Sequence, residues 1–127
     1  MHNNFDIPTL GIDLDGTIDE YPLFFRTLSN SWPGRVVIIT YRKNQAAAEE
    51  RAKEFGIKFD ELILATSMDD KAKIIKRENI GAFFDDMDEF ITHIPDSVPV
   101  FKVRNGGNFE NGKWIYSSAT GIHIDDM

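Results

Sequence analysis

Apolar runs and helical patterns alternate along the chain, and this alternation predicts the fold class. Five short, mostly apolar segments predict β-strands at residues 10–14, 36–39, 62–64, 82–84 and 98–103. The second and fourth are continuously apolar, which is typical of strands buried on both faces of a parallel sheet. Helical patterns separate the segments, so their order predicts an α/β domain with a central parallel sheet of about five strands and right-handed crossovers.

Helices are expected at residues 22–30, 44–55, 71–79 and 87–94. In the second of these, Ala48, Ala52 and Phe55 recur at positions i, i+4 and i+7, so they form one apolar face. The third helix begins after Asp70, a residue type that commonly caps a helix N-terminus.

The pattern changes towards the C-terminus. Asn111-Gly112 between aromatic residues is typical of a β-hairpin with a type I′ turn. We therefore expect a single domain over residues 1–127, with a core at about 8–103 and an appended tail or hairpin at 104–127.

Composition narrows the choice of function. A chain of 127 residues is long enough for one domain, and no apolar run approaches the length needed to span a bilayer. The absence of cysteine excludes disulfides and agrees with a cytoplasmic location. The net charge of −7 argues against a nucleic-acid binder. It leaves a single phosphate group open as a ligand, and clustered carboxylates are what Mg²⁺ prefers.

Polar residues follow three of the predicted strands, at the edge where ligands bind in an open α/β sheet. These segments are Asp13-Leu14-Asp15-Gly16-Thr17, Thr40-Tyr41-Arg42 and Asp85-Asp86. Asp13 and Asp15 are two apart on an extended segment, so their side chains point to the same side. Because neighbouring carboxylates repel, one is easily protonated while the other stays ionised, which provides a nucleophile and a general acid/base. A plain turn after a strand would use similar residues.

Four segments of the chain resemble, in order, the motifs of a known family, the haloacid dehalogenase-like hydrolases. Residues 13–17 resemble its first motif, Asp-x-Asp-Gly-Thr after an apolar strand, and residues 36–40 are similar to its second, an apolar strand that ends on Thr or Ser. Lys71 opens a helix as the third-motif lysine does, and residues 82–86 resemble the Asp-Asp form of the fourth motif. The resemblance covers about residues 10–103 and implies a Rossmann-like, three-layer domain.

The resemblance also implies a function, a magnesium-dependent phosphatase that hydrolyses a phosphate monoester through an aspartyl-phosphate intermediate. Asp13 would attack phosphorus, and Asp15 would protonate the leaving oxygen and then activate water. Mg²⁺ would be bound by the Asp13 carboxylate, the backbone carbonyl of Asp15 and the Asp86 carboxylate. Thr40 would bind the phosphoryl oxygens, and Lys71 would neutralise charge beside the nucleophile.

Two assignments have neighbours as alternatives. Lys73 could take the place of Lys71, which we prefer because it lies at the helix start, nearest the strand ends. Asp85 and Asp86 are adjacent on a strand and point opposite ways, so one of them should bind the metal directly. We assign Asp86 to the metal and Asp85 to a supporting hydrogen bond.

The substrate is expected to be small and phosphorylated. Thr40-Tyr41-Arg42 looks like a Thr-x-Arg variant found in nucleotidase and polynucleotide-phosphatase branches, in which Arg42 could fork onto a substrate phosphate; an ordinary surface arginine is the alternative. Tyr21, Phe24 and Tyr41 would suit a nucleotide-like ring at the rim.

The gaps between the motifs have no room for a cap domain, so the site should be open, or covered by the tail or by a second subunit of an oligomer. Other functions remain as alternatives. One is a nucleotidase or phosphotransferase of narrow specificity, and another is a non-catalytic phosphate-binding domain of the same fold. The presence of Asp15 argues against the non-catalytic domain, because binding needs no general acid.

Overall fold

Five parallel strands form a central sheet in the order β3-β2-β1-β4-β5, in a computed structural model that describes residues 6–116. The strands are β1 (Thr9–Ile12), β2 (Val36–Thr40), β3 (Glu61–Leu64), β4 (Ile80–Asp85) and β5 (Val100–Lys102). Every neighbouring pair in this sheet is parallel. The predicted fold class, a Rossmann-like α/β arrangement, is confirmed.

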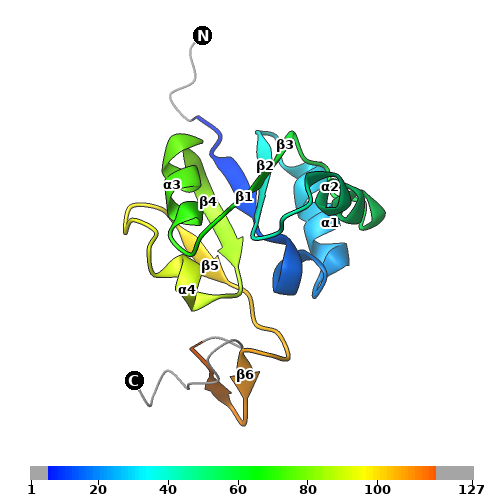
Figure 1. Ribbon diagram of the computed structural model, residues 1–127. Coiled ribbons are helices and arrows are strands. Elements are labelled where there is room, and N and C mark those ends of the chain that lie inside the picture. Colours follow the sequence, from blue (N-terminus) through cyan, green and yellow to red (C-terminus); the bar gives the residue numbers. More distant parts are fainter. Residues whose placement is uncertain (1–5, 117–127) are drawn as a thin grey trace.

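Helices cover both faces of the sheet. They are α1 (Pro22–Ser31), α2 (Gln45–Glu54), α3 (Asp70–Arg77) and α4 (Asp88–Ile91). Figure 1 shows α1 and α2 on one side of the sheet and α3 and α4 on the other. Between β1 and β2 lie η1 (Leu14–Ile18), a kinked turn in which Asp15 and Gly16 are not helical, and α1. Helix α2 lies between β2 and β3. In the described part of the chain, no helix is long and apolar enough to cross a bilayer.

Strand β2 contributes side chains to two apolar clusters, one on each face of the sheet. All five of its residues are buried, and alternate side chains point to opposite faces. Val36 and Ile38 pack in the apolar cluster beneath α1 and α2, whereas Val37 and Ile39 pack in the cluster beneath α3. The strand is therefore apolar at both sets of positions, as its sequence pattern predicted.

The expectation that Asp70 caps α3 was wrong. The N-cap residue is Asp69, whose side chain makes no capping hydrogen bond, and Asp70 is the first helical residue. The Asp70 carboxylate instead accepts hydrogen bonds from the Thr66 backbone N–H (2.7 Å) and hydroxyl (3.0 Å). It fixes the loop between β3 and α3, a role that two successive aspartates do not reveal in the sequence.

The predicted C-terminal hairpin is confirmed. Strands β6 (Phe109–Glu110) and β7 (Lys113–Trp114) pair antiparallel. Asn111 and Gly112 both have positive φ, 51° and 78°, as a type I′ turn requires. Figure 1 shows the hairpin below the sheet, beyond the ends of the strands. Residues 117–127 of the expected tail lie outside the described residues.

Candidate active site

The first motif continues β1 and then turns sharply. Asp13 is still extended, and its backbone N–H donates to the Phe84 carbonyl of β4 (2.9 Å). Gly16 follows with a φ of +80°, and a Cβ atom there would lie 2.2 Å from an oxygen of Asp86. Only glycine therefore fits the turn, for its conformation and for the close approach of Asp86.

Three buried carboxylates meet where β1 and β4 end. Asp13, Asp85 and Asp86 each offer an oxygen, and these oxygens lie within 4.8 Å of one another. Lys71, in the first turn of α3, reaches into the cluster. Its Nζ atom lies 2.7 Å from Asp13 Oδ1 and 2.8 Å from Asp85 Oδ2. The structure thus brings together three acidic residues from two motifs and a lysine that pairs with two of them, Asp13 and Asp85.

The two candidate lysines differ sharply in their surroundings. The Lys71 side chain is 1% exposed, whereas that of Lys73 is 71% exposed and pairs with Asp69. Burial alone would lower the pKa of Lys71, but the charges of Asp13 and Asp85 outweigh this effect and raise the pKa above its ordinary value. Lys71 also lies 3.9 Å from the centroid of the Phe90 ring. It is therefore held as a cation inside the domain.

Asp85 and Asp86 have different partners. Asp85 accepts from Lys71 and from the backbone N–H groups of Asp86 (2.7 Å) and Met87 (3.0 Å), so both of its oxygens are engaged. Asp86, in contrast, forms no ion pair with a lysine or arginine of residues 6–116. Burial and the neighbouring charge of Asp85 raise the pKa of Asp86 to about 6.

The nucleophile candidate is perturbed in the same direction. Burial raises the pKa of Asp13 well above its ordinary range, and the charge of Asp85 adds to this, while Lys71 opposes it. Three carboxylates lie around one lysine, so in their ionised form they carry more negative charge than Lys71 offsets. A hard divalent cation with oxygen ligands, such as Mg²⁺, would fit this donor set.

A small pocket of about 120 Å³ opens onto Asp13 and Lys71. Thr40, at the end of β2, also lines it. The Thr40 hydroxyl is buried and has no hydrogen-bond partner in residues 6–116. Because a buried polar group without a partner is costly, this hydroxyl is available for a ligand oxygen.

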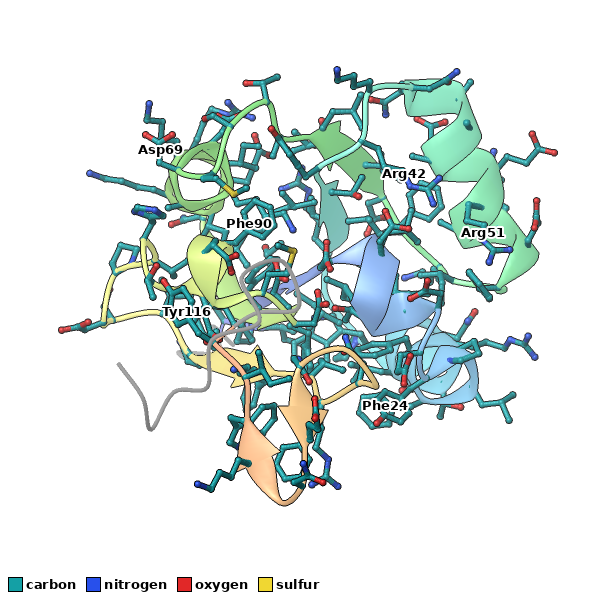
Figure 2. All side chains as sticks on the ribbon, turned by 60° about the horizontal axis from the view of Figure 1, so that its bottom comes forward. Phe24, Arg42, Arg51, Asp69, Phe90 and Tyr116 are labelled. Atoms are coloured by element: carbon teal, nitrogen blue, oxygen red, sulfur yellow. The ribbon has the colours of Figure 1, made fainter. Side chains whose placement is uncertain are left out.

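Arg42 makes a contact that sequence reasoning missed. Its Nε and Nη2 atoms donate to the two carboxylate oxygens of Asp15, at 2.8 and 2.7 Å. The guanidinium fork that was expected to meet a substrate phosphate therefore holds Asp15 in this structure. Figure 2 shows Arg42 and Phe90 on opposite sides of the strand ends.

The predicted aromatic rim divides between two surfaces. Tyr41 lines the 120 Å³ pocket. Tyr21 instead donates its hydroxyl to the Arg104 carbonyl (2.6 Å), and Phe24 packs near Phe84, with ring centroids 6.3 Å apart. Phe24 lies away from Arg42 and Phe90 in Figure 2. Tyr21 and Phe24 therefore do not line this pocket with Tyr41, contrary to expectation, because their contacts are with Arg104 and Phe84.

Two asparagines of the segment after β5 also belong to the site. Asn105 donates to the Asp86 carboxylate (3.0 Å), and Asn108 donates to the Asp86 carbonyl (3.0 Å). The sequence Asn105-Gly106-Gly107 indicated only a loop. Asparagines beside glycines occur in many ordinary loops, so this part of the sequence could not identify a functional site.

Comparisons with known proteins support the fold. No protein-family model and no curated protein matches the sequence. The core domain of a proposed phosphoglycolate phosphatase from Streptococcus pneumoniae aligns with a TM-score of 0.55 and 13% identity, over 87% of this chain and 88% of that chain. A universal stress protein in complex with cAMP aligns with a TM-score of 0.49 and 10% identity, over 77% of this chain and 98% of that chain. At such identities, the likeness to the phosphatase core shows a shared Rossmann-like α/β fold.

Proposed function

We propose that this protein is a magnesium-dependent phosphatase of the haloacid dehalogenase-like class, which forms an aspartyl-phosphate on Asp13. The observation that carries the proposal is the buried cluster of Asp13, Asp85 and Asp86 around Lys71. Burying charge is costly, so an acidic cluster with incomplete neutralisation at the ligand-binding edge of an α/β sheet is typical of a functional site.

The available ligands fit the metal that this class uses. Asp13 and Asp86 would supply carboxylate oxygens and Asp15 its backbone carbonyl, while Asp85, already engaged by three donors, would orient its neighbours. When bound, Mg²⁺ would offset the negative charge of these carboxylates and of the substrate phosphate.

The chain's own residues account for both halves of the reaction. Asp13 forms a bond to phosphorus as the bond to the leaving oxygen breaks, and Asp15 gives that oxygen its proton. Asp15 then takes a proton from water, whose oxygen attacks phosphorus and releases Asp13 and inorganic phosphate. Lys71 and the Thr40 hydroxyl would stabilise charge on the phosphoryl oxygens.

The two pockets at this edge suggest how a substrate would be accommodated. The 120 Å³ pocket has room for a phosphoryl group and little more. Beside it lies a pocket of about 500 Å³ that shares Tyr41 and has Leu64, Ala65 and Arg42 in its walls. An apolar floor beside an aromatic ring suits a ring-bearing leaving group, which favours the second candidate function, a nucleotidase of narrow specificity.

Turnover of an aryl phosphate tests the proposal. We expect hydrolysis with Mg²⁺, none with excess chelator, and none by Asp13→Asn, because this substitution removes the attacking oxygen and a metal ligand together. Asp96→Asn, which changes an exposed acidic residue outside the site, is the matched control and should retain full activity. Phosphate binding without turnover of any aryl, nucleoside or sugar phosphate would instead indicate a binding domain.

A comparison of two substrates tests the second candidate. A nucleoside monophosphate should have a higher kcat/KM than a hexose phosphate, because its ring can occupy the larger pocket. Equal or higher kcat/KM for the hexose phosphate would contradict the nucleotidase assignment while leaving the phosphatase intact.

A further inference from the structure

The segment after β5 reaches back to both acidic loops of the site. The Asn105 side-chain amide donates one hydrogen bond to the Gly16 carbonyl (2.9 Å) and another to Asp86 Oδ2 (3.0 Å). One amide group thereby joins the loop after β1 to the end of β4. The other Asp86 oxygen faces the Thr17 hydroxyl at 3.5 Å, a distance too long for a strong hydrogen bond.

Asn105 is itself held in place by its neighbours. Its Oδ1 atom accepts from the Gly107 N–H (2.8 Å), and its backbone N–H donates to Asn108 Oδ1 (2.9 Å). Asn108 is buried, and its amide donates to the carbonyls of Asp86 (3.0 Å) and Val103 (2.8 Å). These hydrogen bonds fix the backbone of Asn105, so its side-chain amide is held in position beside Asp86.

The hairpin anchors this segment from its far end. The Ile115 N–H donates to the Asn108 carbonyl (2.8 Å). Lys102 pairs with Asp88 of α4 (2.6 Å) and lies 4.5 Å from the centroid of the Trp114 ring. Hydrogen bonds and ring contacts thus form a continuous connection from the hairpin to Asp86.

We propose that Asn105 is a positioning residue for the metal site, so that the segment between β5 and the hairpin completes that site. The metal's identity rests on the proposed function. Asn105 fixes the rotation of the Asp86 carboxylate and holds Gly16 beside it, so less motion is lost when Asp86 binds a cation. Partners that orient metal-binding carboxylates typically contribute about 10- to 100-fold to metal affinity.

Calorimetric titration of the metal-free protein with Mg²⁺, without substrate, tests this inference. We expect Asn105→Ala to weaken Mg²⁺ binding about tenfold. The matched control is Asn30→Ala, which also removes an amide that donates to two backbone carbonyls, those of Arg26 (2.8 Å) and Gly56 (3.0 Å), away from the site. Both variants should lose similar stability in thermal melts, but Asn30→Ala should bind Mg²⁺ as the wild type does.

A second variant guards against misfolding of Asn105→Ala. In Asn105→Ser, the hydroxyl can still accept from the Gly107 N–H in a turn, but it is too short to reach Asp86. It should show the same weakening of Mg²⁺ binding. In turnover assays, the Mg²⁺ concentration for half-maximal activity should rise about tenfold in both Asn105 variants, whereas kcat at saturating Mg²⁺ should stay near the wild-type value.

The outcomes separate this inference from the proposed function. Wild-type Mg²⁺ affinity in both Asn105 variants would overturn the positioning role, even if the protein is a phosphatase. Weakened Mg²⁺ binding in a protein that turns over no phosphate ester would support the positioning role and overturn the function. A wild-type protein that binds no Mg²⁺ would overturn both.

Discussion

Replacing Asp86 with asparagine should stabilise the metal-free protein at neutral pH while it removes metal binding. The carboxylate of Asp86 is buried beside Asp85, and these surroundings raise its pKa from an ordinary 3.8 to about 6. At pH 7 the folded protein must therefore hold a charge that it disfavours. Asparagine has nearly the same shape and carries no charge, so the substitution relieves that cost.

The size of the effect follows from the pKa shift. From 3.8 to about 6 is about 2 pKa units, and each unit corresponds to about 1.4 kcal/mol. Below pH 3.8 Asp86 is protonated in both the folded and the unfolded chain. As the pH rises towards 6, the unfolded chain releases this proton first, so the folded state loses about 3 kcal/mol of stability. Above that pH the loss stays constant.

The assay is denaturant unfolding in chelator at several pH values between 4 and 7. Asp86→Asn should exceed the wild type by about 3 kcal/mol at pH 7, equivalent to a Tm rise on the order of 10 °C, and the two should converge towards pH 4. Asp96→Asn should follow the wild-type profile. If the profiles of Asp86→Asn and the wild type ran parallel, or the variant were less stable at pH 7, Asp86 would not carry this electrostatic cost.

Three further substitutions test other contacts. Gly16→Ala would place a methyl group 2.2 Å from Asp86 Oδ2 at a φ of +80°, so Mg²⁺ affinity measured by calorimetry should fall by about tenfold or more; unchanged affinity would contradict the need for glycine. Lys71→Met should cost about 3–5 kcal/mol in chelator at pH 7, because it leaves buried carboxylates without their cation, and a loss below about 1 kcal/mol in denaturant unfolding would refute this. Arg42→Ala should change stability by less than about 1 kcal/mol, since its ion pair is partly exposed, yet lower kcat about tenfold by freeing Asp15. Arg42→Lys should not restore kcat, because an ammonium group cannot form the fork.

The sequence was sufficient to predict the sheet and the edge at which the acidic residues lie. Alternating apolar and helical segments define parallel strands, and parallel strands bring their carboxyl ends to one edge, so Asp13 and Asp86 were expected at the same edge. The structure adds that β1 lies directly beside β4, which brings the two residues together. Lys71 was also predictable in position, because a helix that follows a strand of this sheet begins at the same edge. These inferences depend on local patterns and on the handedness of crossovers, which vary little between proteins.

The remaining contacts depend on long-range packing. Asn105 meets Gly16 across 89 residues of sequence, and no periodic pattern marks a loop asparagine as the partner of a distant carbonyl. The fork between Arg42 and Asp15 was missed for a related reason, because a guanidinium matches a protein carboxylate as well as a phosphate. Tyr21 and Phe24 were misplaced because their position depends on how α1 lies across the sheet.

The contact between Asn105 and Gly16 also bears on the order in which the molecule assembles. Asn105 follows β5 and reaches the Gly16 carbonyl only where β1 and β4 already lie side by side, so this contact should form after the sheet. The same ordering applies in reverse to partial unfolding, in which regions with few apolar contacts open at lower free energy than the core. Amide hydrogens of residues 104–108 should therefore exchange before those of β1 and β2. Tight binding of Mg²⁺ would then be the last property gained on folding and the first lost on gentle heating.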